Sequence, residues 1–202
     1  MARQSIRSLL STAAAIAALL VSVAGVGAQT DPDAAAMQRF ARAVQEYATL
    51  RRHIARTVPA VEISADAGRI RNATDTLAAA IRAARPGAAT GNIFARDIAA
   101  VFKKRIHQSL AAGGYDTTAL LAAINEDAET SDAIAVVNGP FPWARGSMML
   151  PSLLTVLPRL PQDLEYRFVD RDLVLVDIEA GLVVDILPAV LAGDGQHTDL
   201  RR

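Results

Sequence analysis

The chain has 202 residues, no cysteine, and equal numbers of basic and acidic residues, so its formal net charge is zero. The lack of cysteine excludes disulfide bonds and thiolate metal sites, and stability has to come from packing. Hydrophobic residues make up 51% of the chain but aromatic residues only 4%, which favours a thin and helix-rich core.

The N-terminal residues have the pattern of a removable secretion signal. Two arginines precede an apolar run over residues 9–26, and Val26 and Ala28 suit the small-residue positions before a cleavage site. We therefore expect a signal peptide over residues 1–28, a mature chain that begins at Gln29, and a periplasmic or secreted location. An uncleaved membrane anchor is the alternative, since the run is just long enough to span a bilayer. No later stretch is apolar enough, so no transmembrane helix is expected after cleavage.

Residues 29–130 carry apolar side chains at spacings of three and four, which predicts a small antiparallel helical bundle. Three or four helices are expected: from Asp31 to Pro59, from Ser64 to Arg85, from Arg96 to Gly113, and a shorter fourth from Ala119 to Glu129. The apolar stripe of the first helix consists of Met37, Phe40, Val44, Tyr47, Leu50, Ile54 and Val58. Asp31 and Ser64 are the expected N-caps of the first two helices.

The pattern changes after the bundle. Residues 131–163 are rich in proline and predict an extended linker, within which Met148–Leu157 suits either a short helix or extended chain. Within residues 164–190, Leu164, Tyr166 and Phe168 alternate with Glu165, Arg167 and Val169, and two further strands are expected over residues 173–178 and 182–187 after tight turns. This pattern predicts a three-stranded antiparallel β-meander packed on the bundle. Residues 191–202 are expected to form a disordered tail. The sequence therefore predicts an α+β fold.

The zero net charge conceals two halves of opposite sign. Residues 34–112 contain thirteen basic and five acidic side chains, whereas residues 113–202 contain six basic and fourteen acidic ones. Such asymmetry indicates either two halves that dock on each other or a basic face for anionic lipid head groups or an acidic partner.

Asp177 and Asp185 are the acidic residues that stand out, because each interrupts a strand of leucine, valine and isoleucine. They are the candidates for a weak metal site, or for an acid and base pair in a sheet cleft. The alternative interpretation, which we favour, is that the acidic residues of this region lie at turns and on the exposed face of the sheet. If either were buried it would need a partner, and Arg167 on the preceding strand is the expected one.

Phe141 and Trp143, in the segment NGPFPW, form the one concentration of aromatic residues. They suit either an anchor that holds the linker on the core or, if exposed, a recognition segment. No sequence motif for a cofactor is found, so no cofactor is expected. A nucleic-acid partner is not expected either, because aromatic residues are few.

Three segments, LEYRFVDRDLVLVDIEAGLVVDILP, NIFARDIAAVFKKRI and NGPFPW, resemble an uncharacterised family of small secreted bacterial proteins. The likeness covers most of the mature chain. The turn from Asp177 to Gly181 also resembles the C-terminal hairpin of periplasmic proteins linked to nickel and cobalt homeostasis. The chain lacks a histidine-rich or cysteine-bearing segment, so the resemblance implies no metal role here.

These observations predict a secreted or periplasmic interaction module, or one associated with the cell envelope, that is not an enzyme. Its partner would be an unknown protein or an envelope surface. The alternatives are a periplasmic metal-handling protein and a hydrolase-like enzyme that uses the carboxylates of the meander.

Overall fold

A computed structural model of the chain describes residues 31–126 and 134–192. The predicted signal peptide lies outside the described residues, and so does the predicted tail apart from its first two residues. Leu191, the first residue of that predicted tail, is fully buried, and its N–H donates to the carbonyl oxygen of Arg171. The packed part of the chain therefore extends at least this far.

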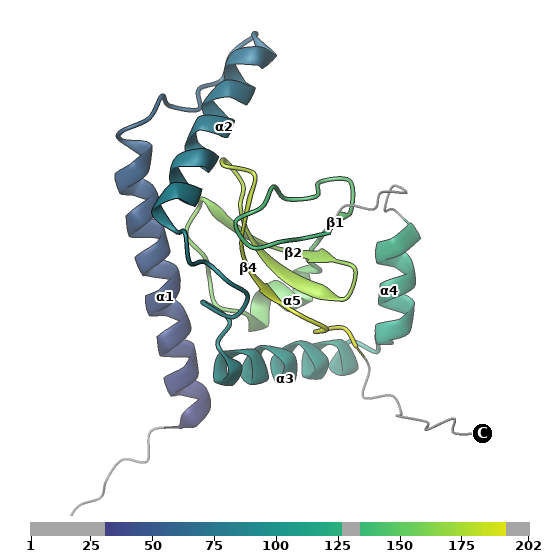
Figure 1. Cartoon of the computed structure of the whole chain (residues 1–202). Coiled ribbons are helices and arrows are strands. Elements are labelled where there is room, and N and C mark those ends of the chain that lie inside the picture. Colours follow the sequence, from purple (N-terminus) through teal and green to yellow (C-terminus); the bar gives the residue numbers. More distant parts are fainter. Residues whose placement is uncertain (1–30, 127–133, 193–202) are drawn as a thin grey trace, which may run out of the picture. The chain divides into compact units, whose positions relative to one another are not determined.

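The described residues form helices followed by an antiparallel sheet, so the predicted α+β class is confirmed (Figure 1). In chain order the elements are α1 (Pro32–Ala55), α2 (Ala67–Ala84), α3 (Arg96–Ala112), α4 (Thr117–Glu126), β1 (Gly146–Met148), α5 (Pro151–Val156), β2 (Leu164–Val169), β3 (Asp172–Asp177) and β4 (Leu182–Leu187). Among these helices none is both long and apolar enough to cross a membrane.

The N-cap residue of α2 is Asp66 and not Ser64, which the sequence predicts. The carboxylate of Asp66, not the hydroxyl of Ser64, accepts hydrogen bonds from the N–H groups of Gly68 and Arg69. Ser64 instead accepts from the N–H of Asp66 and shapes the approach to the helix. An aspartate at this position satisfies two backbone donors that the first turn leaves free.

The sheet has the strand order β1, β2, β3, β4, and each neighbouring pair is antiparallel. The last three strands are the predicted meander. The fourth strand, β1, was not predicted, because its three residues lie in the proline-rich segment and are too few to show an alternating pattern. The short helix α5 follows it, which settles the alternative left open for Met148–Leu157.

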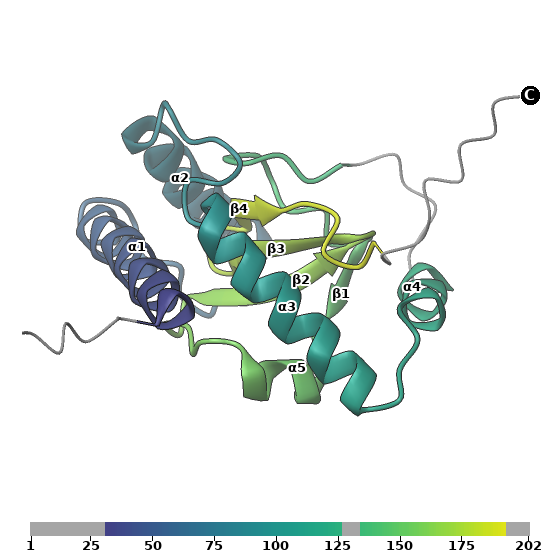
Figure 2. The ribbon, with the colours of Figure 1, turned by 90° about the horizontal axis from the view of Figure 1, so that it is seen from below.

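One face of the sheet packs against the helices. In Figure 2, α3 lies across this face. Aromatic rings form the centre of the shared core: Phe40 of α1 and Phe102 of α3 have ring centroids 4.8 Å apart, and Tyr166 of β2 lies 6.0 Å from Phe102. Phe94, just before α3, adds an edge contact to Phe102 at 5.2 Å. Helices and sheet therefore share a single apolar core.

Residues 134–145, which we name the strap, cover the other face of the sheet. The side chain of Phe141 is buried there in a second apolar cluster with Val169, Val174, Val176, Val183 and Ile186. The strap also runs along the outer edge of β4. The N–H of Asn138 donates to the carbonyl of Val183, the N–H of Val183 donates to Gly139, and the N–H of Phe141 donates to Gly181. The strap thus satisfies backbone groups that an edge strand would otherwise expose.

Gly146 lets the strap close on the sheet, because a Cβ at this position would overlap the buried ring of Phe141. We expect Gly146→Ala to lower the free energy of unfolding by about 1–3 kcal/mol through overpacking. Urea unfolding followed by circular dichroism measures the change. Gly87→Ala is the matched control, since nothing lies within 4 Å of a Cβ there. Equal stability of the two variants would contradict this role.

Candidate functional site

Asp177, one of the two predicted acidic candidates, is fully buried at the end of β3 and has partners on both carboxylate oxygens. Its Oδ2 accepts from the hydroxyl of Tyr47 at 2.8 Å and from Nε of Arg51 at 3.0 Å. Its Oδ1 accepts from the N–H of Ala180 at 3.0 Å, which ties it to the turn that leads into β4. Asp177 therefore joins α1 to the last hairpin of the sheet.

Arg51 is the centre of this polar cluster. It is buried on α1 and forms ion pairs with Asp177, with Asp163 at 3.3 Å, and with Glu179. Burial alone would lower the pKa of the Arg51 guanidinium, but the three carboxylates outweigh burial and the pKa is raised. This arginine of the basic half thus binds three carboxylates of the acidic half, which favours docking between the halves over a free cationic face at this position.

Tyr47 and Arg85 continue the buried cluster toward β4. Burial, followed by the charge of Asp177, raises the pKa of the Tyr47 phenol far above its usual range. The guanidinium of Arg85 lies 5.0 Å from the centre of the Tyr47 ring and donates to the side chain of Asn138 and to the carbonyl of Val184. Burial lowers the pKa of Arg85. These contacts connect α1, the end of α2 and the strap.

Asp185, the second acidic candidate, is also fully buried, but its partners are backbone amides. Its carboxylate accepts from the N–H groups of Gly91 at 2.8 Å, Ile93 at 2.6 Å and Phe94 at 2.7 Å, and from Ile186 at 2.8 Å. These N–H donors replace the water that the carboxylate loses on burial. Asp185 therefore holds the loop between α2 and α3 on the sheet.

A register shift in β4 places Asp185 on the helix side. Asp185 lies opposite Leu175, but Val183 already lies opposite Val176, so Val184 is an extra residue in β4. An inserted residue of this kind bends the strand and redirects the side chains that follow it. Without the shift, simple alternation would place Asp185 on the opposite face from Leu175.

Arg167 is not the partner of either aspartate, so the pairing expected from the sequence is wrong. Asp177 lies opposite Leu164 and therefore on the same face of the sheet, the face that packs on the helices. Arg167 is an odd number of residues from Leu164, on the other face, and pairs with Glu165 instead. The partners of the aspartates come from α1 and from the loop before α3.

These carboxylates are poorly placed for chemistry on a substrate. Asp177 and Asp185 have no exposed surface, and their oxygens already accept bonds from the protein. A general acid or base has to reach the proton that it transfers. Within residues 31–126 and 134–192, moreover, no three His, Cys, Asp or Glu side chains form a group that could hold a metal ion. Of the histidines, His53 is exposed on α1, and Nε2 of His107 lies 2.7 Å from the carbonyl of Val190.

The two aromatic candidates of the strap are in contact but differ in exposure. Phe141 is buried in the second apolar cluster, whereas 53% of the surface of Trp143 is exposed. Their rings meet edge to face, with centroids 4.9 Å apart. Phe141 therefore anchors the strap, and a recognition role for Trp143 stays a prediction.

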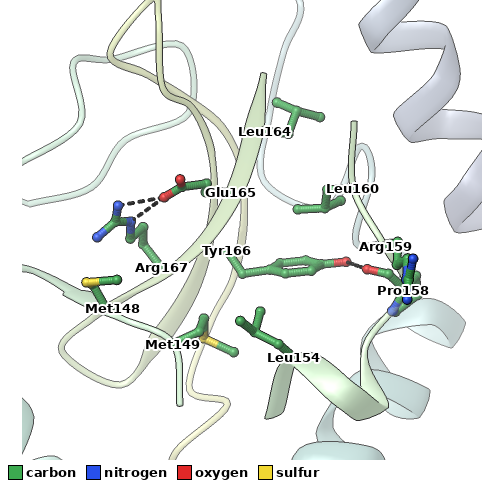
Figure 3. A pocket seen from close by; sticks show the side chains of 10 residues that line it. All are labelled: Met148, Met149, Leu154, Pro158, Arg159, Leu160, Leu164, Glu165, Tyr166 and Arg167. Carbon is green, nitrogen blue, oxygen red and sulfur yellow. Dashed lines mark hydrogen bonds and ion pairs between the residues drawn. The ribbon is translucent and has the colours of Figure 1, made fainter. Parts of the chain in front are cut away.

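An apolar pocket of about 410 Å³ lies between β1, α5 and β2 (Figure 3). The residues that line it are Met148, Met149, Leu154, Pro158, Arg159, Leu160, Leu164, Glu165, Tyr166 and Arg167. Figure 3 shows the Tyr166 ring with Leu160 on one side and Met149 and Leu154 on the other. The hydroxyl of Tyr166 donates to the carbonyl of Pro158 at 3.1 Å. Burial raises the pKa of this phenol, so the hydroxyl remains a donor.

The pocket follows the edge of the sheet. Residues 164–167 all line it, although successive side chains of a strand point to opposite faces. Only a groove along the strand edge can touch both faces. β1 pairs with residues 167–169 of β2 and ends at Met148, and none of the strands in the described part of the chain pairs with residues 164–166 on that side. There the N–H of Leu164 donates to the carbonyl of Pro161 instead.

Two exposed side chains make the pocket unusual for a protein surface. Met148 is 76% exposed and Leu154 is 51% exposed, and both border the same cavity. Clustered apolar exposure beside a cavity is typical of a binding site, unlike single exposed apolar residues. The only sequence signal for these residues is weak: two adjacent methionines precede leucines in a segment that suits either a helix or extended chain.

Comparison with known proteins finds no relative of this chain. No protein-family model matches the chain, and no curated protein or solved structure does either. The resemblances noted from the sequence therefore stay predictions.

Replacing Arg51 tests whether the polar cluster is structural. Arg51→Met removes the cation and leaves Asp177 buried without its ion pair, so we expect the free energy of unfolding to fall by about 3–5 kcal/mol. Chemical denaturation measures the loss. Arg39→Met on the same helix is the control, because the Arg39 and Asp97 pair is exposed to solvent and should matter little. If both variants lost the same stability, the buried cluster would not have the importance assigned to it.

Proposed function

We propose that this protein is a non-catalytic binding module that works outside the cytoplasm, in association with the cell envelope, and that binds its partner at the apolar pocket beside β2. The observation that supports this best is the meeting of exposed apolar side chains, Met148 and Leu154, with a cavity of about 410 Å³. This volume lies within the range of about 300–1,000 Å³ that ligand sites have.

The buried carboxylates support binding over hydrolysis. A hydrolase that used the meander would need two carboxyl groups facing one open cavity. Asp177 and Asp185 instead hold α1 and the loop before α3 on the sheet. Neither residue lines the pocket. The same contacts weigh against metal handling, because both aspartates already have positively charged or N–H partners.

The location outside the cytoplasm rests on the signal pattern of residues 1–28. Expressed in a Gram-negative host, the chain should be recovered from the periplasmic fraction with Gln29 as its first residue, as mass spectrometry of the intact protein would show. Ala28→Arg should block cleavage, because the site accepts only small residues. Recovery of the uncleaved wild-type chain from the cytoplasm would contradict this part of the proposal.

The pocket can be tested with an environment-sensitive dye, anilinonaphthalene sulfonate. We expect its fluorescence to rise with the wild-type protein and most of the rise to be lost in the double variant Met148→Gln and Leu154→Gln. Glutamine is neutral, so the anionic dye is not repelled. The control, Ile134→Gln with Val136→Gln, removes two exposed apolar side chains that do not line the pocket. Equal dye binding by both double variants would argue against the pocket.

A further inference from the structure

We propose that the apolar pocket beside β2 binds an unbranched alkyl chain that ends in a carboxylate, and that Arg159 binds the carboxylate at the rim. A free fatty acid of medium length has this chemistry. This inference rests on the proposed function, since it names the class of ligand for the same pocket.

The polar groups of the pocket offer little to a polar ligand. Four polar side chains line it, and three of them are bound within the protein: Tyr166 to a backbone carbonyl, and Arg167 to Glu165. The N–H of Leu164 is bound as well, to the carbonyl three residues before it. A polar group that leaves water without gaining a partner weakens binding. The part of the ligand that lies inside the pocket should therefore be hydrocarbon.

The length and the walls of the pocket suit an alkyl chain. Four consecutive residues of β2, from Leu164 to Arg167, line it, and four residues of a strand span about 10 Å. An extended alkyl chain advances about 1.25 Å per C–C bond, so about eight to ten carbons match this span. The walls include Met148 and Met149, and methionine side chains adapt to the shape of an apolar ligand.

Arg159 supplies the charge that selects the head group. Its side chain is exposed at the pocket, and within the described part of the chain it forms no ion pair. Figure 3 shows Arg159 beside Pro158, beyond the hydroxyl of Tyr166. The other charged residues of the pocket, Glu165 and Arg167, neutralise each other. One guanidinium matches the single charge and the two oxygens of a carboxylate.

The dependence of affinity on chain length tests the alkyl site. Isothermal titration calorimetry with hexanoate, octanoate and decanoate should give dissociation constants that fall at least about fourfold for every two carbons, because one buried CH₂ contributes about that factor. Dodecanoate should bind no more tightly than decanoate, since its chain is longer than the pocket. The double variant Met148→Gln and Leu154→Gln should lose most of the binding, whereas Ile134→Gln with Val136→Gln should bind normally. An affinity that does not change along the series would overturn the inference.

Arg159→Gln should weaken the binding of decanoate by about tenfold, because the carboxylate loses its guanidinium. Arg171→Gln, which removes an exposed arginine that does not line the pocket, is the control and should bind normally. The uncharged 1-decanol has the same chain length and should bind equally to the wild type and to Arg159→Gln. An equal loss of decanoate binding in both arginine variants would overturn the assignment of Arg159.

The other outcomes separate this inference from the proposed function. If no alkanoate binds while the dye still depends on Met148 and Leu154, the fatty-acid inference is overturned and the binding pocket remains. If the dye does not depend on these residues, both proposals fall. If the protein floats with phosphatidylglycerol vesicles through the same two residues but does not bind decanoate, the ligand is an acyl chain within a membrane, and a free fatty acid is overturned.

Discussion

The buried ion pair between Arg51 and Asp177 is the interaction on which the rest of the structure depends. Removing two charges from water costs several kcal/mol per ion unless close geometry and further hydrogen bonds compensate. Tyr47 and the N–H of Ala180 supply further bonds to the carboxylate, and Glu179 binds the guanidinium. This requirement places α1 against the end of β3, and Phe40 of the same helix contributes to the aromatic core. The burial of Asp185 is compensated in the same way, by hydrogen bonds from backbone N–H groups of the loop before α3.

Much of the fold was predictable because its elements are strongly periodic. Phe40, Val44, Tyr47 and Ile54 of the stripe predicted for α1 are buried, and β2 shows the alternation of burial that its sequence predicts. β3 and β4 are buried on both faces, in agreement with their continuous apolar sequences. The burial of Arg51 could also have been predicted, because Tyr47, Arg51 and Ile54 follow the spacing of three and four and all three are buried. The prediction placed Leu50 in that stripe, because a charged residue is seldom assigned to a core position.

The candidate site was less predictable, since it depends on register and on contacts between distant segments. Simple counting along β2 and β3 would have separated Arg167 from Asp177, but the shift at Val184 that redirects Asp185 leaves no mark in the sequence. The pocket is formed where a three-residue strand, a six-residue helix and the start of β2 meet. Such short elements carry too little periodicity to be placed in advance.

The distance along the chain between Arg51 and Asp177 has a consequence for the order in which the protein acquires its structure. The two residues are 126 positions apart, so α1 carries an uncompensated charge within its apolar stripe until the last hairpin has been synthesised. Closing so long a loop is entropically costly and slows folding. A growing chain would therefore gain little from early compaction, which suits the secretion proposed above.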